Sequence, residues 1–286
     1  MPQPEVDVSV ELVRRLLAEQ HPDLAGLDIG VLANGWDNVI CTVGADLLAR
    51  LPRRAQAAQL VAHEQRWLPA LAGTLPLPIP APVRFGRPSG AFPWNWSVVP
   101  FLPGQVAAIA APDDLTSGAI ALGEFLAALH VPAPPEAPVN PFRGGSLAER
   151  AQRVTDHLGL IGPEADTARA IWDSAMSAAP WPGPPTWVHG DLHPANILVN
   201  GGQISAVIDF GDLTAGDPAT DLSVAWMLLP AREREVFRQA YAHADDYTWA
   251  RARGWALSLA LVFVAFSADN PLMAGIGQRA LREVLI

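Results

Sequence analysis

The sequence contains no lysine, because all 19 of its basic residues are arginine. A Walker A loop needs a lysine after its glycine, and Schiff-base catalysis needs a lysine amine, so both are excluded. Every fixed side-chain cation is therefore a guanidinium, which binds oxyanions through two parallel hydrogen bonds.

Cysteine and long apolar runs are also scarce. Cys41 alone cannot form an internal disulfide, which suits a reducing compartment and excludes a cysteine-based metal site. The start, MPQPEVDV, is acidic and has no apolar core, so no signal peptide is expected. The longest apolar stretch, WALSLALVFVAF at 255–266, is too short to cross a bilayer and predicts a buried helix. We therefore expect a soluble, cytoplasmic protein without a membrane partner.

Length and charge indicate two unequal parts. A chain of 286 residues suits two lobes that each bury a core. Residues 1–102 hold 8 arginines against 9 acidic residues, and residues 103–286 hold 11 against 20, so the second part carries nine of the ten net negative charges. An acidic surface disfavours nucleic acid and favours cationic ligands, although it also serves solubility alone.

Hydrophobic periodicity predicts an α+β fold. Residues 1–102 predict a small lobe with an antiparallel sheet plus a helix, and residues 103–286 a larger, mainly helical lobe, with a hinge at about 98–104. The first lobe should contain, in order, a helix over 9–20 with Ser9 as N-cap, strands over 28–44 and 46–52, a helix over 55–71 and a strand within 95–104. Helices are predicted in the second lobe over 115–130, 146–158, 163–179, 219–229, 231–243, 248–268 and 275–285.

The stretch WVHGDLHPANILVNGGQISAVIDFGD at 187–212 concentrates the chemistry-bearing side chains. Its Asn-Gly-Gly turn separates two β-branched runs and predicts a hairpin centred on residues 200–201 or 201–202. In either case Asn196 and Asp209 fall at the same open end, where amide and carboxylate oxygens suit Mg²⁺. Asp191 lies on the approach loop, five residues before Asn196, and suits a base better than a ligand.

A metallohydrolase site is a competing interpretation of the same stretch. His189, Asp191 and His193 alternate, and alternate residues on a strand share one face. Pro194 argues against an extended strand there, and no further histidine-rich motif lies nearby.

The spacing of Asp191, Asn196 and Asp209-Phe210-Gly211 is typical of kinase-type phosphoryl transfer. VHGDLHPANILV, followed by VIDFGD and GDPATDL, resembles the aminoglycoside and macrolide phosphotransferases, whose fold is protein-kinase-like. The first lobe matches more loosely, with GWDN in the nucleotide-loop position, LLARLP in the strand-three position and HEQRWL on the helix that carries the ion-pair glutamate.

The resemblance implies roles for individual residues. Asp191 would orient the substrate hydroxyl and accept its proton, while Asn196 and Asp209 would hold Mg²⁺ on the phosphates of ATP or GTP. The predicted cofactor-binding residues are Arg50, Glu64, Val99 and Phe101. His189 would support the loop, and Asp217 and Asp221 would be mainly structural.

Two features depart from the family pattern. The strand-three position is usually lysine, and here Arg50 takes it, with Arg53 and Arg54 as rivals that would otherwise be solvated charges after Pro52. A guanidinium can bind phosphate and pair with Glu64, so the role survives in principle. In the nucleotide loop Gly35 is nearly alone, and no glycine-rich pattern covers the phosphates.

The predicted function is phosphorylation of a hydroxyl on a small molecule, such as an aminoglycoside- or macrolide-type antibiotic, with a cationic acceptor favoured by the acidic charge. A kinase of a small metabolite of homoserine, choline or sugar type, and a catalytically silent pseudokinase, remain the alternatives. His193, Asp245, Asp246 and Asp269 are the candidate acceptor-binding residues, with exposed helix-end carboxylates as the simpler interpretation of the three aspartates. The sequence does not indicate an oligomeric state.

Overall fold

The computed structural model describes residues 3–35 and 37–286, so Trp36 of the predicted nucleotide loop lies outside the described residues. The chain forms two compact units. The first contains the residues up to 74 and residues 78–103, and the second contains residues 75–77 and 104–286. The division after Pro103 falls within the predicted hinge. Each unit has its own core.

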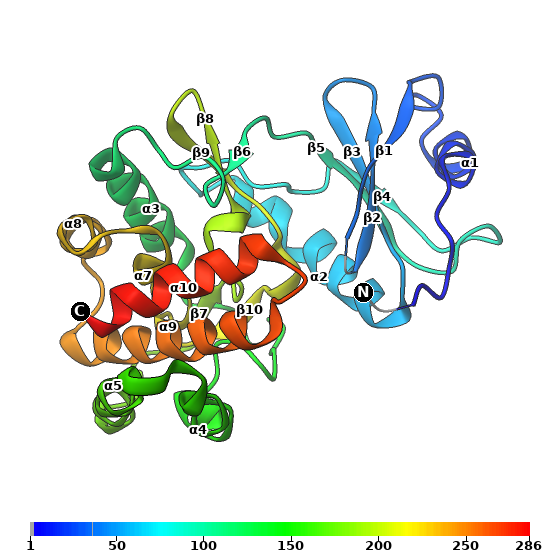
Figure 1. The fold of residues 1–286 in the computed structure, drawn as a ribbon. Helices are drawn as coiled ribbons and strands as arrows, with labels where there is room; N and C mark the ends of the chain where they lie inside the picture. The colour runs from blue at the N-terminus through cyan, green and yellow to red at the C-terminus, as the bar shows by residue number, and fades with distance from the viewer. Residues whose placement is uncertain (1–2, 36) are drawn as a thin grey trace. The chain divides into compact units, whose positions relative to one another are not determined.

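The first unit is a five-stranded antiparallel sheet with the strand order β1-β2-β3-β5-β4. Helix α1 contributes Leu12, Leu16 and Leu17 to a core shared with Cys41 and the other inward-facing strand residues. The predicted Ser9 cap is confirmed, since its side chain accepts a hydrogen bond from the Leu12 amide. The elements are α1 (Val10–Gln20), β1 (Ile29–Asn34), β2 (Asn38–Val43), β3 (Leu47–Pro52), α2 (Ala55–Ala72), β4 (Arg84–Gly86) and β5 (Trp96–Pro100) (Figure 1).

The second unit is mainly helical, with short strands placed among the helices. Strands β6, β8 and β9 form one sheet, and β7 pairs with β10. The elements are β6 (Gln105–Val106), α3 (Leu115–Leu129), η1 (Leu147–Arg150), α4 (Ala151–Leu158), η2 (Gly159–Glu164), α5 (Ala165–Ser177), β7 (Thr186–Val188), η3 (Pro194–Asn196), β8 (Ile197–Asn200), β9 (Gln203–Val207), η4 (Phe210–Asp212), β10 (Thr214–Gly216), α6 (Ala219–Leu222), α7 (Val224–Leu228), α8 (Ala231–Tyr241), α9 (Asp246–Phe266) and α10 (Pro271–Leu285).

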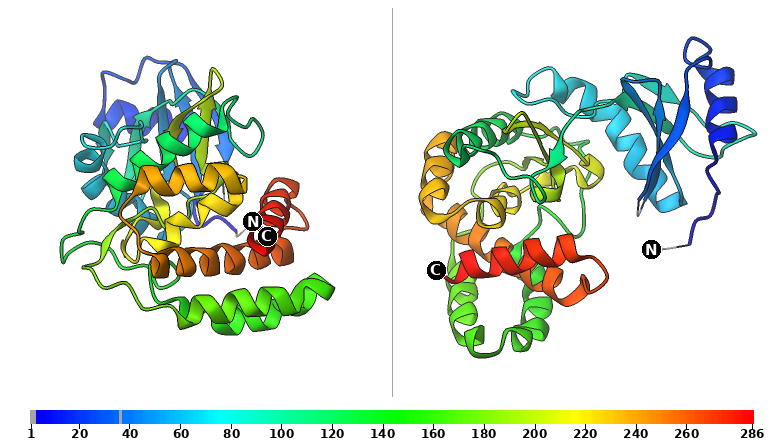
Figure 2. Two further views of the ribbon diagram at one scale, coloured as in Figure 1. Left: turned by 90° about the vertical axis from the view of Figure 1, so that its left-hand side faces the viewer. Right: turned by 45° about the horizontal axis from the view of Figure 1, so that its top comes forward.

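Helix α9 is the central helix of the second unit. It packs against α10, α6, α5 and α4, and Figures 1 and 2 show it lying between α10 on one side and α4 and α5 on the other. By length and composition α9 is also long and apolar enough to span a membrane, but most of it is buried inside the unit. Its apolar run is therefore explained by packing on every side, as the sequence predicted for 255–266.

The predicted helices and strands need two corrections. The helix expected over 219–229 is divided at Ser223, whose hydroxyl donates to the Thr220 carbonyl at 2.6 Å and competes with the helical bonding. Strands β4, β6, β7 and β10 were not predicted. Each has two or three residues and exists through pairing with a distant strand, so no local periodicity marks it.

The hairpin β8–β9 confirms the predicted geometry around the sequence motif. Asn200 pairs with Gln203, so the turn consists of Gly201 and Gly202, both with positive φ. At the other end, the Ile208 amide donates to the Asn196 carbonyl at 2.9 Å. Asn196 and Asp209 therefore flank the same open end of the hairpin.

Candidate active site

The loop between β7 and β8 is held by buried hydrogen bonds. His189 is fully buried, its Nδ1 accepts from the Asp191 amide at 3.2 Å, and its Nε2 lies 3.0 Å from the Ile208 carbonyl. Accepting at Nδ1 places the ring proton on Nε2, which donates to Ile208. His189 thus fastens the loop to the end of β9 and is not available as a metal ligand.

The carboxylate of Asp221 also holds this loop through hydrogen bonds. It accepts from the amides of His189 at 2.7 Å and Gly190 at 2.9 Å, and it lies 3.1 Å from Nε2 of His130. The other nitrogen of His130 lies 2.8 Å from the Tyr241 hydroxyl, whose pKa is raised by burial and by the Asp221 charge. These contacts agree with the structural role predicted for Asp221.

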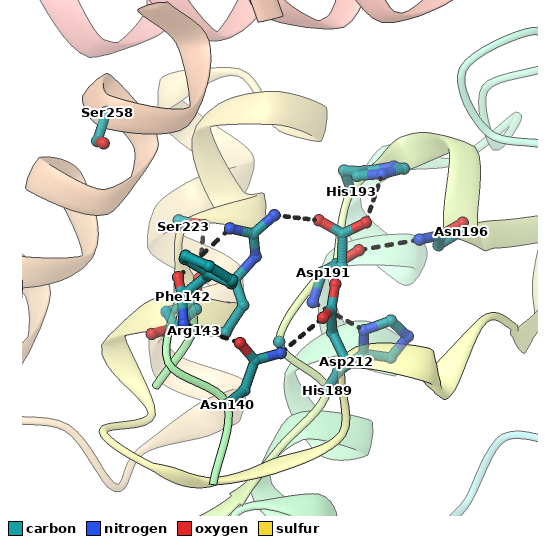
Figure 3. Close-up of polar contacts among 12 residues, drawn as sticks. Asn140, Phe142, Arg143, His189, Asp191, His193, Asn196, Asp212, Ser223 and Ser258 are labelled. Atoms are coloured by element: carbon teal, nitrogen blue, oxygen red, sulfur yellow. Dashed lines mark hydrogen bonds and ion pairs between the residues drawn. The ribbon is translucent and has the colours of Figure 1, made fainter. Parts of the chain in front are cut away.

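Asp191 is the group on the loop best placed to meet a substrate, because its side chain remains 28% exposed while charged groups surround it. Arg143 donates to Oδ1 at 3.1 Å, and His193 Nε2 lies 3.4 Å from Oδ2 (Figure 3). Burial raises the pKa of Asp191, but the hydrogen bond and charge of His193 and the charge of Arg143 outweigh it, so the pKa lies well below its usual range. The carboxylate is therefore ionised across the neutral range.

Asn196 and Asp209 supply the oxygens that a magnesium ion would need. Asn196 Nδ2 donates to the Asp191 carbonyl at 2.9 Å, which leaves its Oδ1 as an acceptor at the hairpin end. Asp209 is exposed and adopts a left-handed backbone (φ 64°), a conformation that non-glycine residues rarely hold without a functional reason. Two protein oxygens suit Mg²⁺, which keeps water and phosphate in its remaining positions.

Two residues beside this site carry no family motif and were not singled out from the sequence. Arg143 reaches Asp191 from the loop before η1, and Asn140 Nδ2 donates to Asp212 Oδ1 at 2.6 Å (Figure 3). Burial and the neighbouring Asp191 charge raise the pKa of Asp212, against the opposing effects of Arg143 and Asn140. Only the charged pattern NPFRGG within a proline-rich stretch could have drawn attention to the loop.

The first unit contains the predicted ion pair. Arg50 on β3 donates from one nitrogen to both Glu64 oxygens, at 3.0 and 3.2 Å, and both side chains are buried. Val99 is buried on β5 opposite Leu48, whereas Phe101, just after the strand, is 41% exposed and its amide donates to the Asp46 carbonyl. The structure thus pairs Arg50 with Glu64, while contacts of these four residues with a nucleotide stay predictions.

The treatment of Arg53 and Arg54 as solvated charges is wrong. Arg53 is buried and donates to the Gly35 carbonyl at 2.9 Å, and Arg54 forms an ion pair with Asp37. Both guanidinium groups fasten the predicted nucleotide loop to the end of β3, because the antiparallel pairing of Asn38 with Pro52 places the loop next to the residues that follow β3.

The candidate acceptor residues do not form one group. His193 is buried beside Asp191, with its ring edge against Phe263. Asp245 caps α9, and the resulting hydrogen bonds from Thr248 lower its pKa, while Asp246 forms an ion pair with Arg238. Asp269 follows the far end of this 21-residue helix, about 31 Å away along the axis. A common ammonium pocket of the three aspartates is therefore excluded by the length of α9.

The metallohydrolase interpretation fails on the same geometry. Both ring nitrogens of His189 are already engaged within the protein. Across residues 3–35 and 37–286, no group of three or more His, Cys, Asp or Glu side chains is arranged to hold a metal ion.

A family model of the phosphotransferase enzyme family matches residues 28–255, which include Arg50, Glu64 and all of the loop and hairpin described above. The chain belongs to this family. The predicted enzyme class, a phosphotransferase with an alcohol group as acceptor, is confirmed with it. The uncharacterized protein YcbJ of Bacillus subtilis (strain 168) is 31% identical over 105 residues, a match that spans 35% of this chain and 34% of that protein.

Solved phosphotransferase structures share the fold over nearly the whole chain. The GDP and kanamycin complex of APH(2'')-IIIa has a TM-score of 0.71 at 22% identity, covering 95% of this chain and 97% of the other. Macrolide 2'-phosphotransferase MphH from Brachybacterium faecium, as apoenzyme, has a TM-score of 0.62 at 25% identity, with coverages of 95% and 97%. The predicted family and the predicted α+β, kinase-like fold class are confirmed.

Proposed function

We propose that this phosphotransferase moves the γ-phosphate of ATP or GTP to a hydroxyl group of a small molecule, with Mg²⁺ as cofactor. The observation that carries the proposal is the pairing of an ionised Asp191, on a rigid loop, with two oxygen ligands at the adjacent hairpin end. Bound Mg²⁺ would neutralise phosphate charge at Asn196 and Asp209.

Asp191 has the position of the group that receives the acceptor. Its carboxylate would accept a hydrogen bond from the hydroxyl whose oxygen forms the new bond to the γ-phosphorus, as the bond from that phosphorus to the β-phosphate oxygen breaks. The hydroxyl proton passes to Asp191 and then to water. Because its pKa is low, Asp191 is a weak base, so its main contribution is orientation, with proton transfer late in the reaction.

The donor nucleotide is supported by related solved structures, which include complexes with GDP and with ATP. In this chain Arg50, held by Glu64, would bind a nucleotide phosphate, and Val99 and Phe101 would contact the base at the end of β5. Cytoplasmic location, where these nucleotides are abundant, belongs to the same proposal.

For the acceptor, aminoglycoside- or macrolide-type antibiotics are supported by relatives such as the kanamycin complex and MphH. A small hydroxylated metabolite is the second candidate. It is favoured by one observation, that an arginine, Arg143, forms an ion pair with Asp191.

The test measures magnesium-dependent nucleotide binding and nucleoside diphosphate release with a panel of hydroxylated compounds. Asp191→Asn should reduce turnover by orders of magnitude and leave the nucleotide Kd nearly unchanged, while Asp209→Ala should abolish the magnesium dependence of that Kd. Full turnover by Asp191→Asn would remove Asp191 from the mechanism. If the nucleotide Kd of the parent protein were the same with and without magnesium, the proposed metal role of Asn196 and Asp209 would be wrong.

A further inference from the structure

The loop that carries Arg143 is fixed to the body of the second unit. The Asn140 amide donates to Thr214 Oγ1 at 2.9 Å, and the Gly144 amide donates to Thr220 Oγ1 at 3.2 Å. The Gly144 carbonyl accepts in turn from the Asp217 amide at 2.8 Å. Arg143 is therefore held next to Asp191 by bonds on both sides of it, and its position is a built feature of the site.

The guanidinium of Arg143 uses only part of its hydrogen-bonding capacity. One terminal nitrogen donates to Asp191, and the other makes a long 3.4 Å contact with its neighbour's carbonyl, at Phe142 (Figure 3). Its Nε is buried and has no hydrogen-bond partner. A buried donor without a partner costs free energy, so a missing acceptor is indicated at this point.

Arg150, seven residues further along, is a second buried arginine, and what it lacks is a carboxylate partner. It is only 3% exposed, donates from Nε to Ser258 Oγ at 3.1 Å and stacks over the Trp255 ring at 5.4 Å. Within the described part of the chain, no carboxylate lies within 4 Å of it. Burial, together with the charges of Arg143 and Arg153, lowers the pKa of Arg150 to about 10.

A buried guanidinium without a counter-ion is unfavourable, and a bound anion would remove that cost. Arg143 and Arg150 lie seven residues apart on the segment that leads into and forms η1, and Asp191 is the one carboxylate that pairs with either of them in the described residues. We propose that Arg143 and Arg150 form an anion subsite beside Asp191, and that the acceptor is a small hydroxylated molecule carrying a carboxylate or phosphate group.

This inference rests on the proposed phosphotransferase function, since it concerns the molecule whose hydroxyl meets Asp191. That hydroxyl must lie about 2.6–3.2 Å from an Asp191 oxygen, and Arg143 lies on the same carboxylate. The anionic group and the hydroxyl are therefore a few bonds apart, as in a hydroxy acid or a polyol phosphate. A polycationic acceptor would instead meet two guanidinium groups of like charge.

The experiment uses matched acceptors that differ in one charge. Gluconate is compared with sorbitol for a carboxylate, glycerol 3-phosphate with glycerol for a phosphate, and kanamycin serves as the cationic probe. Ligand binding is followed by thermal shift with and without magnesium nucleotide, and turnover by nucleoside diphosphate release. The variants are Arg143→Gln, Arg150→Met and Arg150→Lys, with Arg169→Met, an exposed arginine on α5, as the control.

We expect an anionic member of a pair to raise the Tm of the parent protein more than its neutral partner does, and its acceptor Kd or KM to rise at least tenfold in Arg143→Gln and Arg150→Met. The nucleotide Kd should be unchanged in these variants. The Arg169→Met protein should bind both acceptors as the parent protein does. Arg150→Lys should retain part of the preference for the anionic acceptor. This variant also keeps the test possible if Arg150→Met does not fold. The pair that responds distinguishes carboxylate from phosphate.

Equal responses within both pairs, no response to either anion, or a preference for kanamycin would each overturn the anion subsite. A loss of kcat in Arg143→Gln that is equal for charged and neutral acceptors would do the same, because Arg143 would then act on the nucleotide phosphate. Failure of the proposed function is recognised separately, by a parent protein that binds no magnesium nucleotide.

Discussion

At the scale of single residues, a guanidinium occupies the strand-three position where the family usually has an ammonium group. Arg50 has less conformational freedom than a lysine would have, because its planar head is locked against both oxygens of Glu64. Its neighbours Arg53 and Arg54 hold the adjoining loop. Of the three arginines at the end of this strand, Arg50 therefore has the predicted phosphate contact, and Arg53 and Arg54 support the loop.

Arg50→Ala should lower kcat/KM for the nucleotide by about 1.5–3 kcal/mol, roughly tenfold to a hundredfold, because a charge-assisted bond is lost. Arg50→Lys should recover much of this loss, since the charge remains. Steady-state kinetics at varied nucleotide concentration measures the effect, with urea unfolding to correct for the unpaired Glu64. Arg54→Ala is the matched comparison, and a larger loss there would mean that the phosphate contact was assigned to the wrong arginine.

The low pKa of Asp191 depends on two neighbouring side chains, on the hydrogen bond and electrostatic effect of His193 first and on the Arg143 charge second. Burial favours the neutral acid and raises the Asp191 pKa, whereas these two neighbours lower it. Removing either neighbour should therefore raise the Asp191 pKa. We expect a larger rise in His193→Gln than in Arg143→Gln. The ¹³C chemical shift of the Asp191 carboxyl, titrated by NMR from about pH 2 to 7, tests the order, and an unchanged titration in both variants would contradict the electrostatic account.

At the scale of elements, the catalytic loop is shaped by close backbone contacts. Gly190 has φ +88°, and a Cβ there would lie 2.3 Å from the Asp212 carbonyl oxygen. The β7–loop–β8 segment and the η4 turn therefore fit together only with glycine at this position. This contact sets where Asp191 stands relative to Asp209 and Asp212.

Gly190→Ala should reduce both turnover and the unfolding midpoint, because the loop must move away from Asp212. Gly201→Ala is the control, since Gly201 also has positive φ but a Cβ there would meet no atom within 4 Å. The control should lose only the cost of a left-handed alanine, about 1–2 kcal/mol, and keep its activity. Turnover and urea midpoints measured side by side decide it, and equal effects would mean that backbone strain alone matters at position 190.

At the scale of the whole molecule, the first unit contains two histidines whose pKa values are lowered by burial. In the first unit, burial lowers the pKa of His21, with a contribution from the Arg84 charge, and burial lowers the pKa of His63, with a contribution from Arg66. A histidine with a lowered folded pKa binds fewer protons when folded than when unfolded. Stability is then fully present above the ordinary pKa of 6.5 and is lost as the pH falls below it.

The urea midpoint of the first unit should therefore fall between about pH 7 and pH 5.5, before the carboxylates of the second unit titrate. The double variant His21→Gln with His63→Gln should show a smaller fall over this range. The indole NMR signal of Trp96 during urea unfolding at each pH provides the measurement, because Trp96 is buried in the first unit against His21. Identical pH dependence in parent and variant would show that other groups govern acid unfolding.

Local sequence by itself determined most of the helices, the hairpin and the order of Asp191, Asn196 and Asp209. Periodicity, the Ser9 cap and the Gly201-Gly202 turn act between near neighbours, so the pattern of residues is sufficient to predict them. The shared hairpin end follows from the same local pairing.

Only the tertiary structure decided what surrounds Asp191. Arg143 lies 48 residues before it, and Ser258 lies 108 residues after Arg150, so neither contact leaves a periodic or spaced pattern in the chain. The three aspartates near α9 are close to the same helix in sequence but not in space. Asp245 and Asp246 lie at its start, and Asp269 follows its end. Net charge indicated an acidic unit, whereas the charge beside the catalytic carboxylate depends on which loops pack together.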